Sequence, residues 1–192
     1  MNCILAGVGG QGTVLASKLI AQAGLSNGLK VRTAETIGMA QRGGCVVSHV
    51  RTGTDIKSPL VPVGQADIII GFEPAEAVRN LPYLKKDGVA VVALKAVRPV
   101  TASLTGSSYD GSDMVEYLKN NVKNLILVDG EAICASVGSS KVLNIALLGA
   151  ALNALNISAV EMEATIRKNV RPQFIDMNLQ ALHAGMNAAK EL

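Results

Sequence analysis

Short apolar runs alternate with segments of helical periodicity along most of the chain. The clearest run, residues 67–72, contains three consecutive isoleucines and no alternating polar positions. A continuous run of this kind is typical of a strand that is buried on both faces of a sheet. Similar runs predict five further strands, at residues 3–6, 31–35, 45–51, 88–94 and 125–128.

Apolar residues at helical spacing predict helices between and after these strands. They fall at residues 13–24, 74–81, 141–155 and 175–191. Pro74 opens the second helix, and Glu73 and Glu76 lie in its first turn, where the helix dipole favours acidic side chains. Segments 53–64 and 101–112 are rich in Pro or in Ser, Thr and Gly, so we expect loops there.

Buried strands that alternate with helices predict the fold class. We expect a single α/β domain over residues 1–192, a three-layer α/β/α sandwich around a mostly parallel, Rossmann-like sheet.

The first predicted strand runs into a glycine-rich turn that opens the first helix. Residues 7–12 read Gly-Val-Gly-Gly-Gln-Gly. This is the setting of a dinucleotide fingerprint, in which backbone N–H groups at the helix start face a phosphate or carboxylate. Glu35, at the end of the second strand, lies where a ribose-binding acid would lie. The alternative is that the glycines only allow a tight turn between strand and helix.

A second glycine-rich segment precedes the third strand. Residues 41–44 read Gln-Arg-Gly-Gly, and Arg42 is suited to holding a carboxylate or phosphate through two hydrogen bonds. His49 and Arg51 share one face of the strand that follows, so they could line a site together. The alternative, favoured for His49 taken alone, is a satisfied and partly buried side chain.

Lys141 and Asn144 lie one helical turn apart, directly after two serines. They form a candidate anion or partner site. A helix that is capped by Ser139 or Ser140 is the simpler explanation.

Composition excludes several function classes. Of the 192 residues, 49% are hydrophobic, 17% charged and 3% aromatic, and the net charge is +3. This balance argues against disorder and, because the basic residues are scattered and aromatics are few, against nucleic-acid binding. The first residues lack the basic leader of a signal peptide, and asparagines interrupt the longest uncharged stretch, residues 142–160. We therefore expect a cytoplasmic protein with no membrane span.

The chain lacks the usual catalytic motifs. It has no Gly-x-x-x-x-Gly-Lys-Ser/Thr loop, no Gly-x-Ser-x-Gly elbow and no His-Glu-x-x-His. Two histidines and three widely separated cysteines predict neither a metal site nor a disulfide framework. We therefore expect no catalytic and no metal-binding residue on this chain.

Four segments, in this order, resemble a known family. They are the glycine-rich turn at residues 7–12, residues 41–51, residues 67–73 and residues 141–150. Together they resemble the gamma-type subunits of 2-oxoacid:ferredoxin oxidoreductases, and the chain is most similar there to the beta subunit of indolepyruvate ferredoxin oxidoreductase. The resemblance covers nearly the whole chain, and it is the combination of segments that is specific.

The resemblance implies a role inside a larger enzyme. Members of that family decarboxylate a 2-oxo acid on thiamine diphosphate, join the acyl group to coenzyme A, and pass electrons through iron–sulfur clusters to ferredoxin. This chain lacks both the Gly-Asp-Gly start of the thiamine diphosphate motif and clustered cysteines. The resemblance therefore places thiamine diphosphate and the [4Fe-4S] clusters on large catalytic partner subunits, with coenzyme A as a co-substrate of the complex. The isolated chain is expected to be inactive and to reach ferredoxin only through the complex.

In such a complex, the two glycine-rich segments are expected to form a ridge at the carboxyl ends of the strands. The ridge would contact the catalytic subunit near its cofactor, or an anionic group of the substrates, with Arg42 and His49 as polar contacts. The candidate contact residues are Gly7, Gly9, Gly10, Gln11, Gly12, Gln41, Arg42, Gly43, Gly44, His49, Lys141 and Asn144.

Two other interpretations stay open. One is a free-standing Rossmann-type protein that binds NAD(P) or FAD; the other is an assembly subunit whose glycines serve only packing. The substrate is open too, with indolepyruvate and other aryl pyruvates preferred over branched-chain oxo acids, pyruvate and 2-oxoglutarate. Stoichiometry, and a homodimer of the isolated chain, also stay open. The high aliphatic and glycine content favours a chain that is partly buried in a complex.

Overall fold

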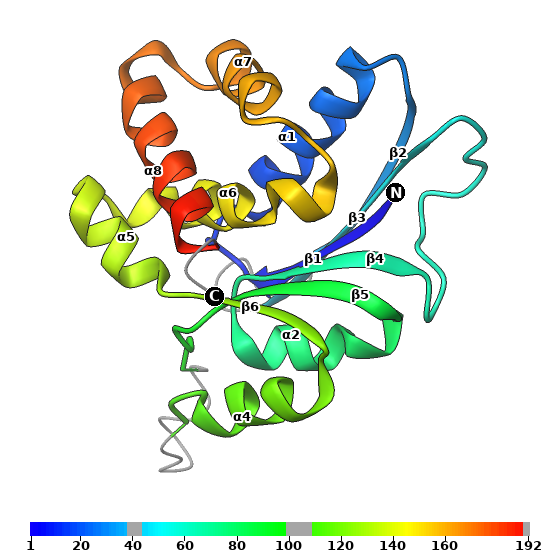
Figure 1. The fold of residues 1–192 in the computed structure, drawn as a ribbon, viewed down its shortest axis with the longest axis vertical. Coiled ribbons are helices and arrows are strands. Elements are labelled where there is room, and N and C mark those ends of the chain that lie inside the picture. Colours follow the sequence, from blue (N-terminus) through cyan, green and yellow to red (C-terminus); the bar gives the residue numbers. More distant parts are fainter. Residues whose placement is uncertain (38–43, 99–108, 190–192) are drawn as a thin grey trace.

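The computed structural model describes residues 1–37, 44–98 and 109–189. A six-stranded sheet lies between two layers of helices (Figure 1). The strand order is β2-β3-β1-β4-β5-β6. The strands are β1 (Asn2–Val8), β2 (Lys30–Ile37), β3 (Cys45–Gly53), β4 (Ala66–Gly71), β5 (Leu84–Ala93) and β6 (Asn124–Val128).

The sheet is mostly parallel, as the apolar runs predict. β1, β4, β5 and β6 are parallel neighbours, whereas β3 runs antiparallel to both β1 and β2. Because β3 is reversed, its first residue, Cys45, pairs with Val8, the last residue of β1. The start of β3 therefore lies at the same end of the sheet as the glycine-rich turn.

The two helical layers differ in size. In Figure 1, α2 and α4 cover one face of the sheet, whereas α1, α5, α6, α7 and α8 lie on the opposite side. On that larger side, α1 and α6 pack on the strands, and α5, α7 and α8 pack against these helices. The helices are α1 (Thr13–Ser26), α2 (Pro74–Asn80), α4 (Ser112–Asn121), α5 (Gly130–Val137), α6 (Leu143–Leu155), α7 (Ala159–Asn169) and α8 (Ile175–Ala188). The predicted three-layer sandwich is confirmed.

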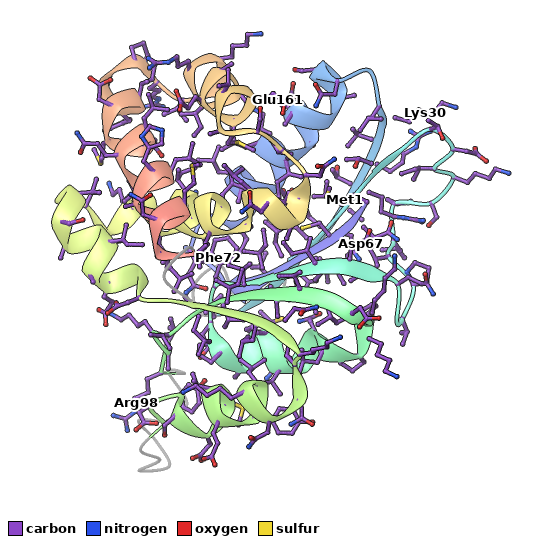
Figure 2. The ribbon with its side chains drawn as sticks, in the orientation of Figure 1. Met1, Lys30, Asp67, Phe72, Arg98 and Glu161 are labelled. Atoms are coloured by element: carbon purple, nitrogen blue, oxygen red, sulfur yellow. The ribbon has the colours of Figure 1, made fainter. Side chains whose placement is uncertain are left out.

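The core fills the space between the sheet and the α1–α6 layer. Its members are almost all aliphatic, and Phe72, which is fully buried directly after β4, is its one aromatic residue among the described residues (Figure 2). The aliphatic content of the sequence is therefore used mainly to bury the larger helical layer.

The predicted helices are present with small shifts. The helix predicted at 141–155 begins as a 3₁₀ turn, η2 (Ser140–Val142), and continues as α6. The hydroxyl of Ser139 accepts a hydrogen bond from the N–H of Lys141, so the expected capping serine is Ser139. The predicted loop at 53–64 is irregular after β3 ends at Gly53, as expected, whereas most of the loop predicted at 101–112 lies outside the described residues.

Candidate functional site

The glycine-rich turn joins β1 to α1 at the carboxyl end of the parallel strands. Gly10 and Gly12 have φ values of +102° and +81°, which favour glycine, and Gly12 is the N-cap of α1. The N–H of Gly9 donates to the carbonyl of Gly44 at 2.8 Å. The turn is therefore fastened to the residue that precedes β3, and the two glycine-rich segments meet there through Gly9 and Gly44.

Gln11 fills the space between the ends of β1 and β4. Its Oε1 accepts a hydrogen bond from the N–H of Val8 at 2.7 Å, and its Nε2 donates to the carbonyl of Phe72 at 2.9 Å. A Cβ on Gly7 would lie 2.7 Å from Oε1 of Gln11, so the glycine makes room for this side chain. Gln11 therefore links two strands through its side-chain amide.

This position is the topological switch point of the sheet. The chain leaves β1 into α1 on one face, and leaves β4 into α2 on the other face (Figure 1). Open α/β sheets bind their ligands in the crevice that such a switch creates. Here the Gln11 side chain lies between the ends of β1 and β4, at the position where a nucleotide site of this kind would open.

Asn144 supports the start of α1 from the neighbouring helix. It is buried, and its Nδ2 donates to the carbonyl of Gly12 at 3.3 Å. A Cβ on Gly12 would lie 2.7 Å from that Nδ2. Lys141, in contrast, is exposed in η2. The two candidate residues therefore lie in different settings: the side chain of Lys141 is exposed, whereas that of Asn144 supports the start of α1.

His49 lies away from the glycine-rich turn. It pairs with Ile4 in the middle of β1, is buried, and its Nδ1 accepts the N–H of Val61 at 3.2 Å. Its ring meets that of Tyr83 edge-on, with centroids 5.9 Å apart, and burial lowers its pKa. His49 thus holds the segment between β3 and β4 against the sheet, and the structure does not bring it to the expected ridge.

The other residues that the sequence predicts to contact a ligand or a partner lie partly outside the described residues. Gln41, Arg42 and Gly43 lie outside the described residues, whereas Gly44 is placed as above. Glu35, the expected ribose-binding acid, is exposed on β2, and its Oε1 accepts the hydroxyl of Ser17 at 3.2 Å.

Sequence reasoning missed a buried acidic cluster beside the turn. Glu73, the N-cap of α2, is 3% exposed; its carboxylate accepts the N–H of Glu76 at 3.0 Å and the hydroxyl of Tyr109 at 2.5 Å. Burial and Glu73 raise the pKa of Tyr109, and burial and Glu76 raise the pKa of the Cys45 thiol. The acidic residues in the first turn of α2 were visible in the sequence, but their contacts with Tyr109 and Cys45 were not.

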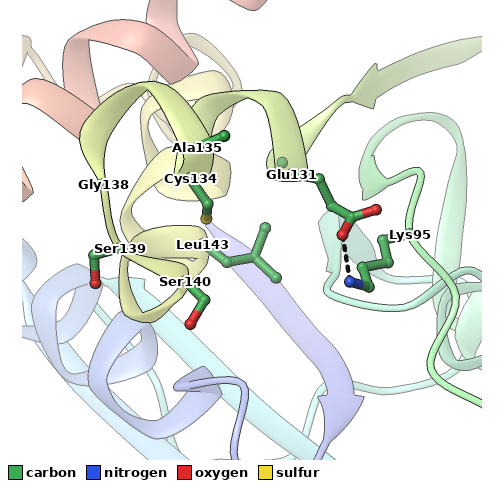
Figure 3. Close-up of a pocket in the computed structure, with 9 residues that line it drawn as sticks. Lys95, Glu131, Cys134, Ala135, Gly138, Ser139, Ser140 and Leu143 are labelled. Atoms are coloured by element: carbon green, nitrogen blue, oxygen red, sulfur yellow. Dashed lines mark hydrogen bonds and ion pairs between the residues drawn. The ribbon is translucent and has the colours of Figure 1, made fainter.

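A pocket of about 480 Å³ opens beyond the ends of β5 and β6 (Figure 3). Cys134 and Leu143 lie on one side of it, and Lys95 forms an ion pair with Glu131 at its rim. The hydroxyls of Ser139 and Ser140 also border it. The pocket combines an apolar wall with a polar rim.

No cluster of three or more His, Cys, Asp or Glu side chains suited to a metal ion occurs among residues 1–37, 44–98 and 109–189. Within the same ranges, no helix has the length and apolarity needed to cross a membrane.

Known proteins resemble this chain over its full length. Residues 2–188 match the family described as pyruvate ferredoxin/flavodoxin oxidoreductase. The indolepyruvate oxidoreductase subunit IorB of Pyrococcus horikoshii is 35% identical, covering 100% of this chain and 96% of that protein.

Solved structures share the fold. The gamma subunit of a keto/oxoacid ferredoxin oxidoreductase from Geobacter sulfurreducens matches with a TM-score of 0.71 and 24% identity, over 100% of this chain and 99% of that one. A 2-oxoglutarate:ferredoxin oxidoreductase from Magnetococcus marinus matches with a TM-score of 0.76 and 20% identity, over 100% of this chain but only 31% of that one. The family resemblance predicted from the sequence is confirmed: this chain belongs to the pyruvate ferredoxin/flavodoxin oxidoreductase family.

Proposed function

We propose that this chain is the small, gamma-type subunit of an indolepyruvate-type 2-oxoacid:ferredoxin oxidoreductase. The observation that carries the proposal is the full-length similarity, at 35% identity, to an indolepyruvate oxidoreductase subunit. The complex would oxidatively decarboxylate a 2-oxo acid, with aryl pyruvates as the first candidates, to an acyl-CoA and pass the electrons to ferredoxin. This chain would contribute binding surface rather than a catalytic group.

The proposal assigns thiamine diphosphate and the [4Fe-4S] clusters to a large partner subunit. Clusters are held by cysteine thiolates, but burial raises the pKa of Cys3, Cys45 and Cys134, which keeps them as thiols. The three also lie apart, with no metal-binding group among the described residues. The cysteines of this chain therefore do not fit a cluster.

The Magnetococcus marinus enzyme supports the need for other domains. The likeness covers only 31% of its chain, so a domain like this one is joined there to a larger polypeptide. That structure holds 2-oxoglutarate, coenzyme A and succinyl-CoA. By analogy, we take coenzyme A as a co-substrate of the proposed complex.

The tip of the glycine-rich turn is the surface that we assign to the catalytic partner. Gly10 is exposed, and a Cβ built on it would meet no atom within 4 Å. Gly9 is held by Gly44, and Gln11 closes the crevice behind the tip. A rigid loop with an open outer side suits a protein surface that approaches closely. Arg42, which lies outside the described residues, is the proposed polar contact with the partner, and Arg42→Ala should lower assembly or turnover.

Co-expression with a candidate large subunit tests the activity. We expect oxidation of an aryl pyruvate with coenzyme A and a viologen as the ferredoxin substitute, only when both chains are present. Absence of 2-oxo acid oxidation with every candidate large subunit would contradict the proposal. So would saturable binding of NAD(P) or FAD to the isolated chain, weakened by Glu35→Ala.

A pair of glycine variants tests the docking surface. Gly10 and Gly28 both have positive φ, at +102° and +72°, and both have open space around a built Cβ. Asparagine tolerates positive φ better than other side chains, but a φ of +102° lies further from the left-handed region than one of +72°. Gly10→Asn therefore carries more backbone strain than Gly28→Asn, and circular dichroism must show that both variants fold. We expect Gly10→Asn to weaken assembly with the large subunit and Gly28→Asn to leave it unchanged. Equal behaviour of the two variants would remove the turn from the interface.

A further inference from the structure

β2 forms one edge of the sheet, and among the described residues it pairs only with β3. Its eight residues pair in an unbroken antiparallel register, from Lys30 with Gly53 to Ile37 with Val46. The opposite edge strand, β6, has only five residues. A long and regular edge presents a row of unpaired N–H and C=O groups, which is a template for another strand.

β2 lacks most of the features that block such pairing. Natural edge strands are protected by prolines, bulges, inward charges or a covering element. β2 contains no proline and no bulge, and its central residues, Thr33 and Ala34, are uncharged. Thr33 is exposed and Ala34 half-buried. The middle of the edge is therefore open to a partner strand.

The charges of β2 suit an antiparallel copy of itself. Lys30 and Arg32 lie in its first half and Glu35 in its second half. In an antiparallel self-pair, the basic half of one strand lies beside the acidic half of the other. A parallel pair would set like charges side by side, which is unfavourable.

Helix α1 continues this surface on one face of the sheet (Figure 1). A groove of about 350 Å³ runs between α1 and β2, and Val14 and Leu25 at its sides are 42% and 50% exposed. Val14, Lys18, Ala21 and Leu25 follow one stripe of α1 at helical spacing. A two-fold arrangement can bring Val14 of one copy near Leu25 of the other. Lys18 then lies near Ala21 of the other copy, so the two copies of Lys18 do not face each other.

We propose that β2 pairs antiparallel with β2 of a second copy of this chain, so that the two six-stranded sheets become continuous. A two-fold axis perpendicular to the sheet leaves each residue on the same face of the sheet in both copies. Directly opposed residues also share a face, so the axis must lie between the two copies of one residue of β2. With the axis at Thr33, Arg32 lies opposite Ala34 of the second copy. With the axis at Ala34, Arg32 lies opposite Thr36. Neither register opposes like charges, and the pairing would give the proposed enzyme an even number of these subunits.

Sedimentation equilibrium of the full-length chain tests the pairing. We expect a reversible dimer that Ala34→Lys weakens by about tenfold or more, because the new lysine meets Arg32 or its own copy and the two-fold axis makes the change count twice. Ala164→Lys, at an exposed position of α7, is the matched control and should leave the dimer unchanged. Circular dichroism of each variant confirms folding.

Hydrogen exchange gives a readout that needs no substitution. In a free edge strand, every second amide points away from its neighbour and exchanges quickly, whereas pairing protects that second set as well. We expect protection of both sets in central β2 at concentrations where the dimer forms, and loss of the second set on dilution. A monomer at all concentrations, a dimer that Ala34→Lys leaves intact, or protection of the second set only after a large subunit is added would each overturn the proposal.

Discussion

Helices α6 and α8 cross so closely that two glycines mark their contact. A Cβ added to Gly185 would overlap the carbonyl oxygen of Ala146 and lie 2.7 Å from its carbonyl carbon, against the 3.4–4 Å of ordinary van der Waals contact. On the facing helix, a Cβ on Gly149 would lie 3.0 Å from the carbonyl carbon of Leu182. Both obstacles are backbone, so rotation of a side chain cannot relieve them.

We expect Gly185→Ala to lower the free energy of unfolding by about 2 kcal/mol. Extra atoms in a well-packed interior cost about 1–3 kcal/mol. The better helix propensity of alanine offsets up to about 1 kcal/mol of that cost. The rigid obstacle places the cost at the upper end of its range. For a chain of this size, the net change corresponds to a fall in Tm of about 4–8 °C.

Thermal unfolding followed by circular dichroism, with urea denaturation as a second measurement, tests this value. Asn187→Ala, at an exposed position of the same helix, is the matched control, and we expect it to change stability by less than about 0.5 kcal/mol. Helix propensity alone predicts that Gly185→Ala raises the Tm. An unchanged or higher Tm would therefore refute the close crossing of α6 and α8.

Three further predictions concern polar groups. Burial lowers the pKa of His49 in the folded protein below its ordinary value of 6.5. The stability that neutral His49 contributes should therefore be complete above pH 6.5 and be lost as the pH falls through the lowered pKa. His49→Asn should flatten this pH dependence of the free energy of unfolding in urea. For Asp67, burial raises the pKa, but Lys85 and other partners outweigh burial, so the pKa lies below 3.8. The stability that the Asp67 carboxylate contributes should be lost as the pH falls through that lowered pKa. Asp67→Asn should reduce this loss of stability at low pH. Tyr109→Phe removes the hydroxyl that donates to Oε1 of the buried Glu73 carboxylate, which keeps only the N–H of Glu76 as a donor among the described residues. We expect this change to cost about 1–3 kcal/mol in urea unfolding, whereas unchanged stability would contradict the Tyr109–Glu73 hydrogen bond.

Hydrophobic patterning predicted the strands better than the helices. Helices or the segment after β3 cover most of both sheet faces, so the strands appear as continuous apolar runs. The polar helices gave weak signals, since Leu118 is the one buried residue of α4 and only three residues of α7 are buried. The direction of β3 could not be predicted, because an apolar run reads alike from either end.

The glycine-rich turn could be predicted from the sequence, but the contacts that shape it could not. The glycines predicted the position of the turn correctly, because positive φ and close packing both select glycine, which is visible in the sequence. The hydrogen bonds that give the turn its shape join residues far apart in the chain. Gln11 and Phe72 are separated by 61 residues, and Asn144 and Gly12 by 132. No local pattern predicts such contacts, and for the same reason His49 was assigned to the ridge rather than to the segment that it holds.

The six-residue glycine motif combines two physical requirements. Gly7 is explained by packing, because a Cβ there would meet Oε1 of Gln11 at 2.7 Å. Gly12 meets both requirements, with a φ of +81° and Nδ2 of Asn144 at 2.7 Å from a built Cβ. Gly10 is explained by its backbone, with a φ of +102° and open space outside it. A dinucleotide would need the space that Gln11 fills, so a molecule that uses this motif must approach from the outer side of Gly10. Under the proposed function, Gln11 therefore distinguishes this turn from an open nucleotide-binding turn, and Gly10 is the part of the motif that is left for a partner.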